Sequence, residues 1–171
     1  MSHLGRIAID LSGGCQCGAV RYHATERHDN AHICHCRMCQ KAIGNFFAPL
    51  VGIPVESFAW TRGAPSVFLS SEQVQRGFCN RCGTPLFYRN IDNPRISITI
   101  GSLDHPELVT PLNQFGNEAK LPYFAGLPTL EGDTTTEQDD PGFADNIRRT
   151  THQHPDHETD VWPLRQREEQ P

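Results

Sequence analysis

Cys79-Asn80-Arg81-Cys82-Gly83 and Gly14-Cys15-Gln16-Cys17-Gly18 are the stretches that decide the fold of this 171-residue chain. Each holds two cysteines separated by one or two residues and ends in a glycine. Such spacing lets both sulfurs face one metal ion, because a tight turn directs them inward and leaves backbone N–H groups to bond them. We therefore expect these four cysteines to hold a structural zinc ion, which contributes about 10 kcal/mol or more to folding in small zinc domains.

Three further cysteines stand in Cys34-His35-Cys36-Arg37-Met38-Cys39. A shell of four cysteines has no room for substrate, whereas three protein ligands leave a fourth position open. We therefore predict an open, catalytic zinc site here, and two Zn²⁺ per chain. Because this site has one thiolate fewer than the four-cysteine site, its zinc ion is the stronger Lewis acid of the two. The alternative is a second closed site, completed by one of three histidines: His23, His32 or His35.

The cysteines also indicate the compartment in which the protein works. An odd number of closely spaced thiols argues against a secreted disulfide framework, because a reducing compartment keeps thiols available as metal ligands. Residues Met1 to Ser12 lack the long apolar run of a secretory signal, and no later apolar stretch is long enough to cross a membrane. We expect a soluble cytoplasmic protein with no membrane partner. For the cysteines, the alternative to metal binding is that they form disulfides.

Charge is unevenly distributed along the chain. Residues 1–130 carry 11 basic and 9 acidic side chains, whereas residues 131–171 carry 4 basic and 11 acidic ones. The strong basic stripes that release counterions from phosphate backbones are not visible in the sequence. We therefore expect no nucleic-acid partner.

Composition and periodicity predict a mainly β fold with few short helices. The chain has 14 Gly and 13 Pro, which favours short strands joined by turns. Residues 96–100 alternate isoleucine with hydroxyl residues, and residues 19–24 alternate with Arg21 and His23 on the expected solvent face. Residues 36–43 predict a helical turn that ends at Gly44. Further strands are expected at 7–10, 46–51, 58–60, 66–70, 74–78 and 86–88, with a break at 52–54.

The composition changes after about Thr129, where polar and acidic residues dominate. Such a segment cannot bury enough apolar area to order itself. We therefore divide the chain into a zinc domain, residues 1–128, and an acidic tail, residues 129–171. The Val161-Trp162-Pro163-Leu164 patch is an exception that could dock on this domain or on a partner subunit. The tail histidines are assigned no role: His152, His154 and His157.

Four motifs in order resemble the glutathione-dependent formaldehyde-activating (GFA) enzyme family, whose other branch includes centromere protein V. They are the Gly14–Gly18 and Cys34–Cys39 stretches, then Phe78-Cys79-Asn80-Arg81-Cys82-Gly83-Thr84-Pro85-Leu86 and Gly101-Ser102-Leu103-Asp104. The resemblance covers about residues 12 to 128. It implies a β-tent fold of antiparallel sheets, with a structural zinc at the outer cysteine pairs and a catalytic zinc at the middle triplet.

The resemblance further implies an enzyme, a carbon–sulfur lyase that acts on a glutathione adduct. The family's reference reaction relates S-(hydroxymethyl)glutathione to glutathione and formaldehyde, so a small thiol and an aldehyde are the expected partners. Where the family often shows a tryptophan after a proline near the end of the domain, this chain has Leu121-Pro122-Tyr123-Phe124. That departure leaves the substrate open and does not bear on the metals.

Several side chains near the triplet are candidates for roles in the reaction. His35 is the nearest titratable group in sequence that could move a proton, and its alternative role is to orient the loop. Arg37 and Lys41 could attract glutathione carboxylates, and the alternative is that they are solvated surface charges. Phe47 and its neighbour Phe46 could wall the pocket, with one of them in the core.

Two alternatives to an enzyme remain from the sequence alone. One is a zinc-stabilised glutathione carrier or protein-interaction module without catalysis, with the tail as the partner-binding segment. The other is a zinc-ribbon nucleic-acid binder, which the negative charge disfavours. The sequence leaves a homodimer open.

Overall fold

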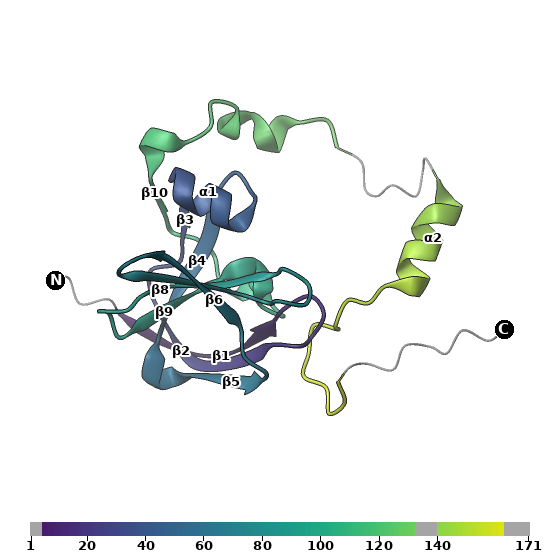
Figure 1. The fold of residues 1–171 in the computed structure, drawn as a ribbon. Helices are drawn as coiled ribbons and strands as arrows, with labels where there is room; N and C mark the ends of the chain where they lie inside the picture. Colours follow the sequence, from purple (N-terminus) through teal and green to yellow (C-terminus); the bar gives the residue numbers. More distant parts are fainter. Residues whose placement is uncertain (1–4, 133–139, 163–171) are drawn as a thin grey trace.

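The computed structural model describes residues 5–132 and 140–162, and in this part of the chain ten strands form two sheets (Figure 1). The small sheet has the order β1-β2-β5, formed by β1 (Arg6–Gly14), β2 (Arg21–His28) and β5 (Phe58–Arg62). The large sheet has the order β10-β3-β4-β9-β8-β7-β6, formed by β10 (Asn113–Phe115), β3 (His32–Cys34), β4 (Ala48–Pro54), β9 (Arg95–Thr99), β8 (Pro85–Asn90), β7 (Val74–Phe78) and β6 (Ser66–Ser71).

Helices are few and short in the described residues. The α-helices are α1 (Arg37–Ile43) and α2 (Pro141–Thr150). Short 3₁₀ segments lie at Val55–Ser57, Ile100–Ser102, Pro106–Leu108, Asn117–Ala119 and Phe124–Thr129. The prediction of a mainly β fold with few short helices is therefore confirmed.

The core lies between the two sheets, where the small sheet packs against one face of the large sheet (Figure 1). Tyr22 of the small sheet is 1% exposed, and its ring contacts Phe58 and Trp60 with centroids 5.6 and 5.9 Å away. Trp60 in turn packs on Phe87 of the large sheet, at 6.0 Å. Aromatic rings thus connect the two layers, which hold the loops that carry the cysteines.

Strand β9 is buried on both faces, whereas the alternating pattern at residues 96–100 predicts burial of the isoleucine face alone. Ser97 and Thr99, on the face opposite the isoleucines, are also buried. Thr99 Oγ1 donates to the Pro85 carbonyl at 2.8 Å, and Ser102 Oγ donates to the Thr99 carbonyl at 2.9 Å. The hydroxyl groups of Thr99 and Ser102 thus satisfy backbone carbonyl groups at this end of the sheet.

Two local expectations were wrong. Strand β4 continues through residues 52–54, where the sequence indicated a break, because these residues pair with β9. Gly52 fits there because the amide of Asn30 and the side chain of Arg95 occupy the space that a Cβ would need. The antiparallel expectation also fails at one end of the sheet, since β10 pairs with β3 in parallel.

The end of α1 is as predicted. Gly44 adopts the left-handed conformation, with φ 68° and ψ 33°, and its N–H donates to the Gln40 carbonyl at 2.9 Å. A glycine at this position avoids the steric cost that a Cβ would add. The helix therefore begins at the triplet and stops after two turns.

The C-terminal residues of the described chain return to the domain. Asp140 caps α2, its Oδ1 accepting from the Phe143 N–H at 2.9 Å, and α2 itself stands apart from the sheets (Figure 1). Residues 151–162, which we call the strap, then run back to the small sheet. Composition alone indicated no ordered structure here, so this part of the structure differs from the expectation. The division of the chain at residue 128 stays a prediction.

Two further observations bear on the sequence analysis. Among the described residues, no helix has both the length and the apolar character needed to span a bilayer. All seven cysteines are free thiols, so the disulfide alternative has no support.

Candidate metal centre

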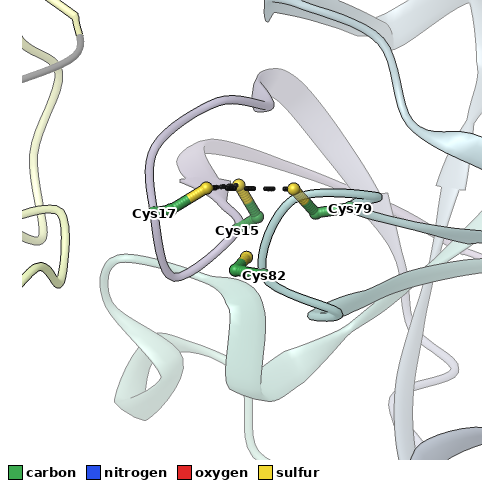
Figure 2. A group of neighbouring side chains, drawn as sticks. All are labelled: Cys15, Cys17, Cys79 and Cys82. Atoms are coloured by element: carbon green, nitrogen blue, oxygen red, sulfur yellow. Dashed lines mark hydrogen bonds between the residues drawn. The ribbon is translucent and has the colours of Figure 1, made fainter.

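The four-cysteine cluster joins two tight turns that are far apart in sequence. Cys15 and Cys17 lie in the turn after β1, and Cys79 and Cys82 lie in the turn between β7 and β8. Figure 2 shows the four side chains pointing toward one another from these turns. Their sulfurs all lie within 4.8 Å of one another, and the predicted grouping is confirmed.

The spacing of these sulfurs fits a tetrahedral metal. Cys17 Sγ lies 3.6 Å from Cys15 Sγ and 3.9 Å from Cys79 Sγ. Zinc–sulfur bonds of about 2.3 Å in a tetrahedron place sulfurs about 3.8 Å apart. The cluster thus has the size that such an ion requires without any rearrangement of the turns.

Both turns supply backbone donors to the sulfurs. The Val20 N–H donates to Cys15 Sγ at 3.3 Å, and the Arg81 N–H donates to Cys79 Sγ at 3.4 Å. Each turn closes on a glycine with positive φ, at 73° for Gly18 and 80° for Gly83. The sequence prediction for Gly83 is confirmed, and both turns share a backbone donor to a sulfur and a closing glycine.

The thiols of this cluster do not ionise alike. Burial raises the pKa of Cys15 to about 12. Burial also opposes ionisation of Cys82, but hydrogen bonds from Thr84 and Cys17 lower the pKa of Cys82 to about 6. A cation at the centre would favour the thiolate form of all four, which accounts for crowding four buried sulfurs together.

The triplet lies at the junction of β3 and α1. Cys34 ends β3, Cys36 is the N-cap residue of α1, and Cys39 lies in its first turn. Their sulfurs lie within 4.8 Å of one another. In residues 5–132 and 140–162 no histidine joins this group, because His23 hydrogen bonds to Asp10 and His32 to the Asn30 carbonyl. Among the described residues, the triplet therefore has three sulfurs and no histidine that closes the site.

A positive side chain reaches the triplet from the large sheet. Arg76 Nη2 donates to Cys39 Sγ at 3.6 Å. Burial opposes ionisation of Cys36, but the Cys39 backbone N–H, the neighbouring thiols and the Arg76 charge lower its pKa below the ordinary value. Burial raises the pKa of Cys34 to about 12. Sequence reasoning missed Arg76, because only the pairing of β7 with β8 carries it to the triplet.

His35 is fully buried beneath the loop that carries the triplet. Its Nε2 lies 3.1 Å from Gln114 Oε1, and its backbone N–H donates to the Phe115 carbonyl at 2.8 Å. Its ring meets Phe124 edge-on, with centroids 4.6 Å apart, and faces Phe47 at 6.1 Å. Within the described chain its Nδ1 has no hydrogen-bond partner. The role of His35 stays a prediction.

The other candidates from the sequence lie around the same loop. Arg37 is exposed and donates to Gln40 Oε1 at 3.1 Å, and Lys41 is exposed on α1. Phe47 is half-buried against Phe124, and Phe46 lies against Tyr123. Tyr123 and Phe124 belong to the segment that departs from the family pattern. The proposed roles of Arg37, Lys41 and Phe47 stay predictions, and the departing segment packs against His35 and the two phenylalanines.

The strap packs against the turn that carries Cys15 and Cys17. Trp162 Nε1 donates to the Cys17 carbonyl at 2.7 Å, and the Arg81 guanidinium lies 4.7 Å from the Trp162 ring. The His154 N–H donates to the Gln16 carbonyl at 2.7 Å, and the His154 ring fills the space beside Gly18. The docking that the sequence allowed for Trp162 thus occurs on its own domain, whereas Pro163 and Leu164 lie outside the described residues.

A buried ion pair supports the strap from below. Arg21 and Asp104 have side chains 2% and 4% exposed, and their two hydrogen bonds measure 2.7 and 2.5 Å. Glu158 of the strap accepts from Arg21 Nε at 3.1 Å. The expectation that Arg21 faces solvent was wrong, because Asp104 lies opposite it in the folded chain. A cavity of about 460 Å³ lies between the strap and the cysteine turns; Arg21 and Asp104 line it, and no residue of the triplet does.

Comparison with known proteins agrees with this arrangement. The family model described as "glutathione-dependent formaldehyde-activating enzyme" matches residues 10–117, which include both cysteine clusters. The chain belongs to the GFA family. A crystal structure of a Rhodobacter sphaeroides protein is similar in fold, with a TM-score of 0.50 and 21% sequence identity over 60% of this chain and 98% of that one.

Membership of the GFA family confirms the resemblance drawn from the four motifs. The likeness to the centromere protein V branch stays a prediction. The strap lies beyond residue 117 and therefore outside the matched part of this GFA chain. The motif Gly101–Asp104 has a structural role here, since Asp104 pairs with Arg21 and Ser102 Oγ lies 2.7 Å from the Tyr22 hydroxyl.

Proposed function

We propose that this protein is a zinc-dependent carbon–sulfur lyase that interconverts S-(hydroxymethyl)glutathione with glutathione and formaldehyde. Family membership supports glutathione-dependent formaldehyde activation. The observation that carries the finer proposal is the triplet of Cys34, Cys36 and Cys39, which no fourth ligand joins among the described residues. Two zinc ions per chain and a cytoplasmic location are parts of the same proposal.

The residues around the triplet suit a thiol substrate. Zinc bound there would supply a Lewis acid that keeps an incoming thiol as its thiolate near neutral pH. In the forward direction the thiol sulfur forms a bond to the formaldehyde carbon, and the thiol proton ends on the new hydroxyl oxygen. The reverse direction breaks that carbon–sulfur bond and returns the proton. Cys34, Cys36 and Cys39 would hold that zinc ion and so fix the position of the incoming sulfur.

The contacts of His35 favour its alternative role over proton transfer. The ring is fully buried, and Gln114, Phe47 and Phe124 surround it. Its main chain bonds β10, which fixes the loop between two of the cysteines. His35 therefore enters the proposal as a positioning residue for the triplet.

The test is Cys36→Ser, which removes one sulfur from the triplet and leaves the other cluster intact. We expect bound zinc to fall from two ions to one per chain, and turnover to fall to the spontaneous rate. Turnover is measured as exchange between formaldehyde and its glutathione adduct by NMR, because thiols also add to formaldehyde without an enzyme. Circular dichroism of the variant verifies the fold. Turnover that is unchanged after loss of one zinc would exclude this mechanism.

A glutathione carrier is the second candidate, since the same triplet could hold a thiol without reacting. It predicts thiol binding with exchange at the spontaneous rate in the wild-type protein. The interaction-module alternative loses its original support, because Trp162 binds the Cys17 carbonyl of its own chain.

A further inference from the structure

Arg76 is a cationic side chain in contact with the triplet, and the proposed reaction gives it no role. It projects from β7, where Nη2 donates to Cys39 Sγ at 3.6 Å and Nε donates to Ser70 Oγ at 3.3 Å. The guanidinium lies over the Tyr88 ring, 5.2 Å from its centroid. Three separate contacts thus hold the charge beside the sulfurs.

No carboxylate in the described residues pairs with this guanidinium. Arg21, by contrast, binds Asp104 and Glu158, and Arg6 binds Glu26 and Glu56. An arginine side chain has five N–H donors in a planar fork that matches a carboxylate. The Arg76 side chain is only half-buried, and N–H groups beyond the two named above have no partner in residues 5–132 and 140–162.

The position of this unpaired fork fits a substrate better than a structural role. A sulfur that joins the triplet must lie near Cys39, which Arg76 contacts directly. In a peptide thiol a carboxylate follows the sulfur after a few bonds, within reach of a guanidinium at that distance. The sequence candidates Arg37 and Lys41 have no hydrogen bond to a cysteine in the described part of the chain, and both are exposed.

We propose that Arg76 binds a carboxylate of the incoming thiol, so that the open site selects thiols that carry a carboxylate over neutral ones. The inference rests on the proposed function, because it assumes that a thiol binds at the triplet. It adds the substrate class and the residue that recognises it. A charge-assisted pair between Arg76 and the carboxylate raises the affinity for a thiol that carries a carboxylate by about tenfold.

The test measures thiol binding rather than turnover. The full chain is loaded with Co²⁺, and its visible and charge-transfer absorption is recorded during titration with glutathione or with its diethyl ester, in which both carboxylates are esterified. The four-cysteine cluster has no position for an added ligand, so its absorption stays constant and reports that the fold is intact. We expect the wild-type protein to bind glutathione about tenfold more tightly than the ester.

The variants assign this preference to one side chain. Arg76→Gln should bind both thiols with equal affinity, and Arg76→Lys should keep part of the preference, because a lysine retains the charge without the fork. The matched control is Arg89→Gln on the adjacent strand β8. Residue 89 follows Tyr88, the cross-strand partner of Arg76, and so lies on the other face of the sheet. It should keep the full preference.

A preference for glutathione that survives in Arg76→Gln would overturn the inference and leave the proposed function standing. Equal loss in Arg89→Gln would overturn it as well, because the effect would then be one of net charge. If neither thiol changes the spectrum of the wild-type protein, the proposed function itself fails. Should Arg76→Gln not fold, the wild-type comparison decides, since equal binding of the two thiols contradicts recognition of a carboxylate.

Discussion

The two cysteine clusters use the same chemistry in opposite surroundings. The four-cysteine cluster joins two distant turns, receives backbone donors at its sulfurs and has the strap against one of those turns. The triplet lies within six consecutive residues, next to a short helix, and is approached by Arg76. The first cluster joins a turn of the small sheet to a turn of the large sheet, whereas the second lies within one strand end and the helix that follows it. The two clusters thus differ in the number of their sulfurs and in the elements around them, and not in residue type.

The sharpest way to break this comparison is to remove one cysteine from each cluster. Cys79→Ser should leave the protein unfolded or lower its Tm by more than about 10 °C, because a structural metal contributes much of the folding free energy. Cys36→Ser should lower Tm far less, since the triplet connects only neighbouring residues. Thermal melts followed by circular dichroism measure both. Equal losses in the two variants would remove the distinction between the clusters.

The buried ion pair gives the next largest effect. Asp104→Asn should lower the free energy of unfolding by about 3 kcal/mol, because it leaves Arg21 charged in a buried position with only the exposed Glu158 as partner. Glu158→Gln is the control and should cost less than about 1 kcal/mol. Urea denaturation measures both changes. A cost for Asp104→Asn as small as that of the control would show that Arg21 does not depend on this partner.

The strap offers a smaller and more selective perturbation. Trp162→Ala removes the hydrogen bond to the Cys17 carbonyl and the ring that Arg81 covers. We expect a chelator to remove metal from the four-cysteine cluster about tenfold faster, and to remove it from the triplet at an unchanged rate. Val161→Ala, at the exposed neighbouring position, is the matched control. Faster release from both clusters would mean that the strap does not protect one of them in particular.

The smallest expected effect is a dependence of the strap on pH. Burial lowers the pKa of His154 below its ordinary value, with Arg21 and Arg62 adding to this and the Pro155 carbonyl and Asp104 opposing it. Neutral His154 is therefore the form that the docked strap favours. Its contribution is fully present above about pH 6.5 and is lost as the pH falls through the lowered pKa.

Tryptophan fluorescence follows this release, because Trp162 leaves its site on the Cys17 carbonyl when the strap detaches. The wild-type signal should change on acidification, whereas His154→Gln should give a signal with little pH dependence. A Trp162→Phe protein identifies the part of the emission that comes from Trp60. A cobalt spectrum recorded alongside verifies that the metals stay bound. A pH response that persists in His154→Gln would assign it to another group.

The cysteine clusters could be predicted because their chemistry is encoded in short spacing. Two thiols one or two residues apart before a glycine define a metal turn without any knowledge of the sheets. The stop of α1 at Gly44 was equally local. The seven cysteines stand as two pairs and one triplet. Combining the two pairs into one site of four leaves the triplet as a site of three, so this grouping could be predicted from the spacing alone.

The contacts of Arg21 and Arg76 could not be predicted, because each depends on strand register. Arg21 reads as solvent-facing by alternation and becomes buried only when Asp104 is brought opposite it. Arg76 contacts a cysteine 37 residues away through the pairing of β7 with β8. The strap was missed for another reason. Its composition is polar, and it is held by a few specific hydrogen bonds rather than by buried apolar area.

Gly18 faces two demands at one atom. Its φ of 73° suits glycine, and a Cβ built there would lie 2.1 Å from the His154 ring. Even alanine would therefore penalise the loop conformation and push the imidazole out of its seat at the same time. In this chain a single missing methyl group ties the shape of a metal-binding loop to the attachment of a segment more than a hundred residues downstream.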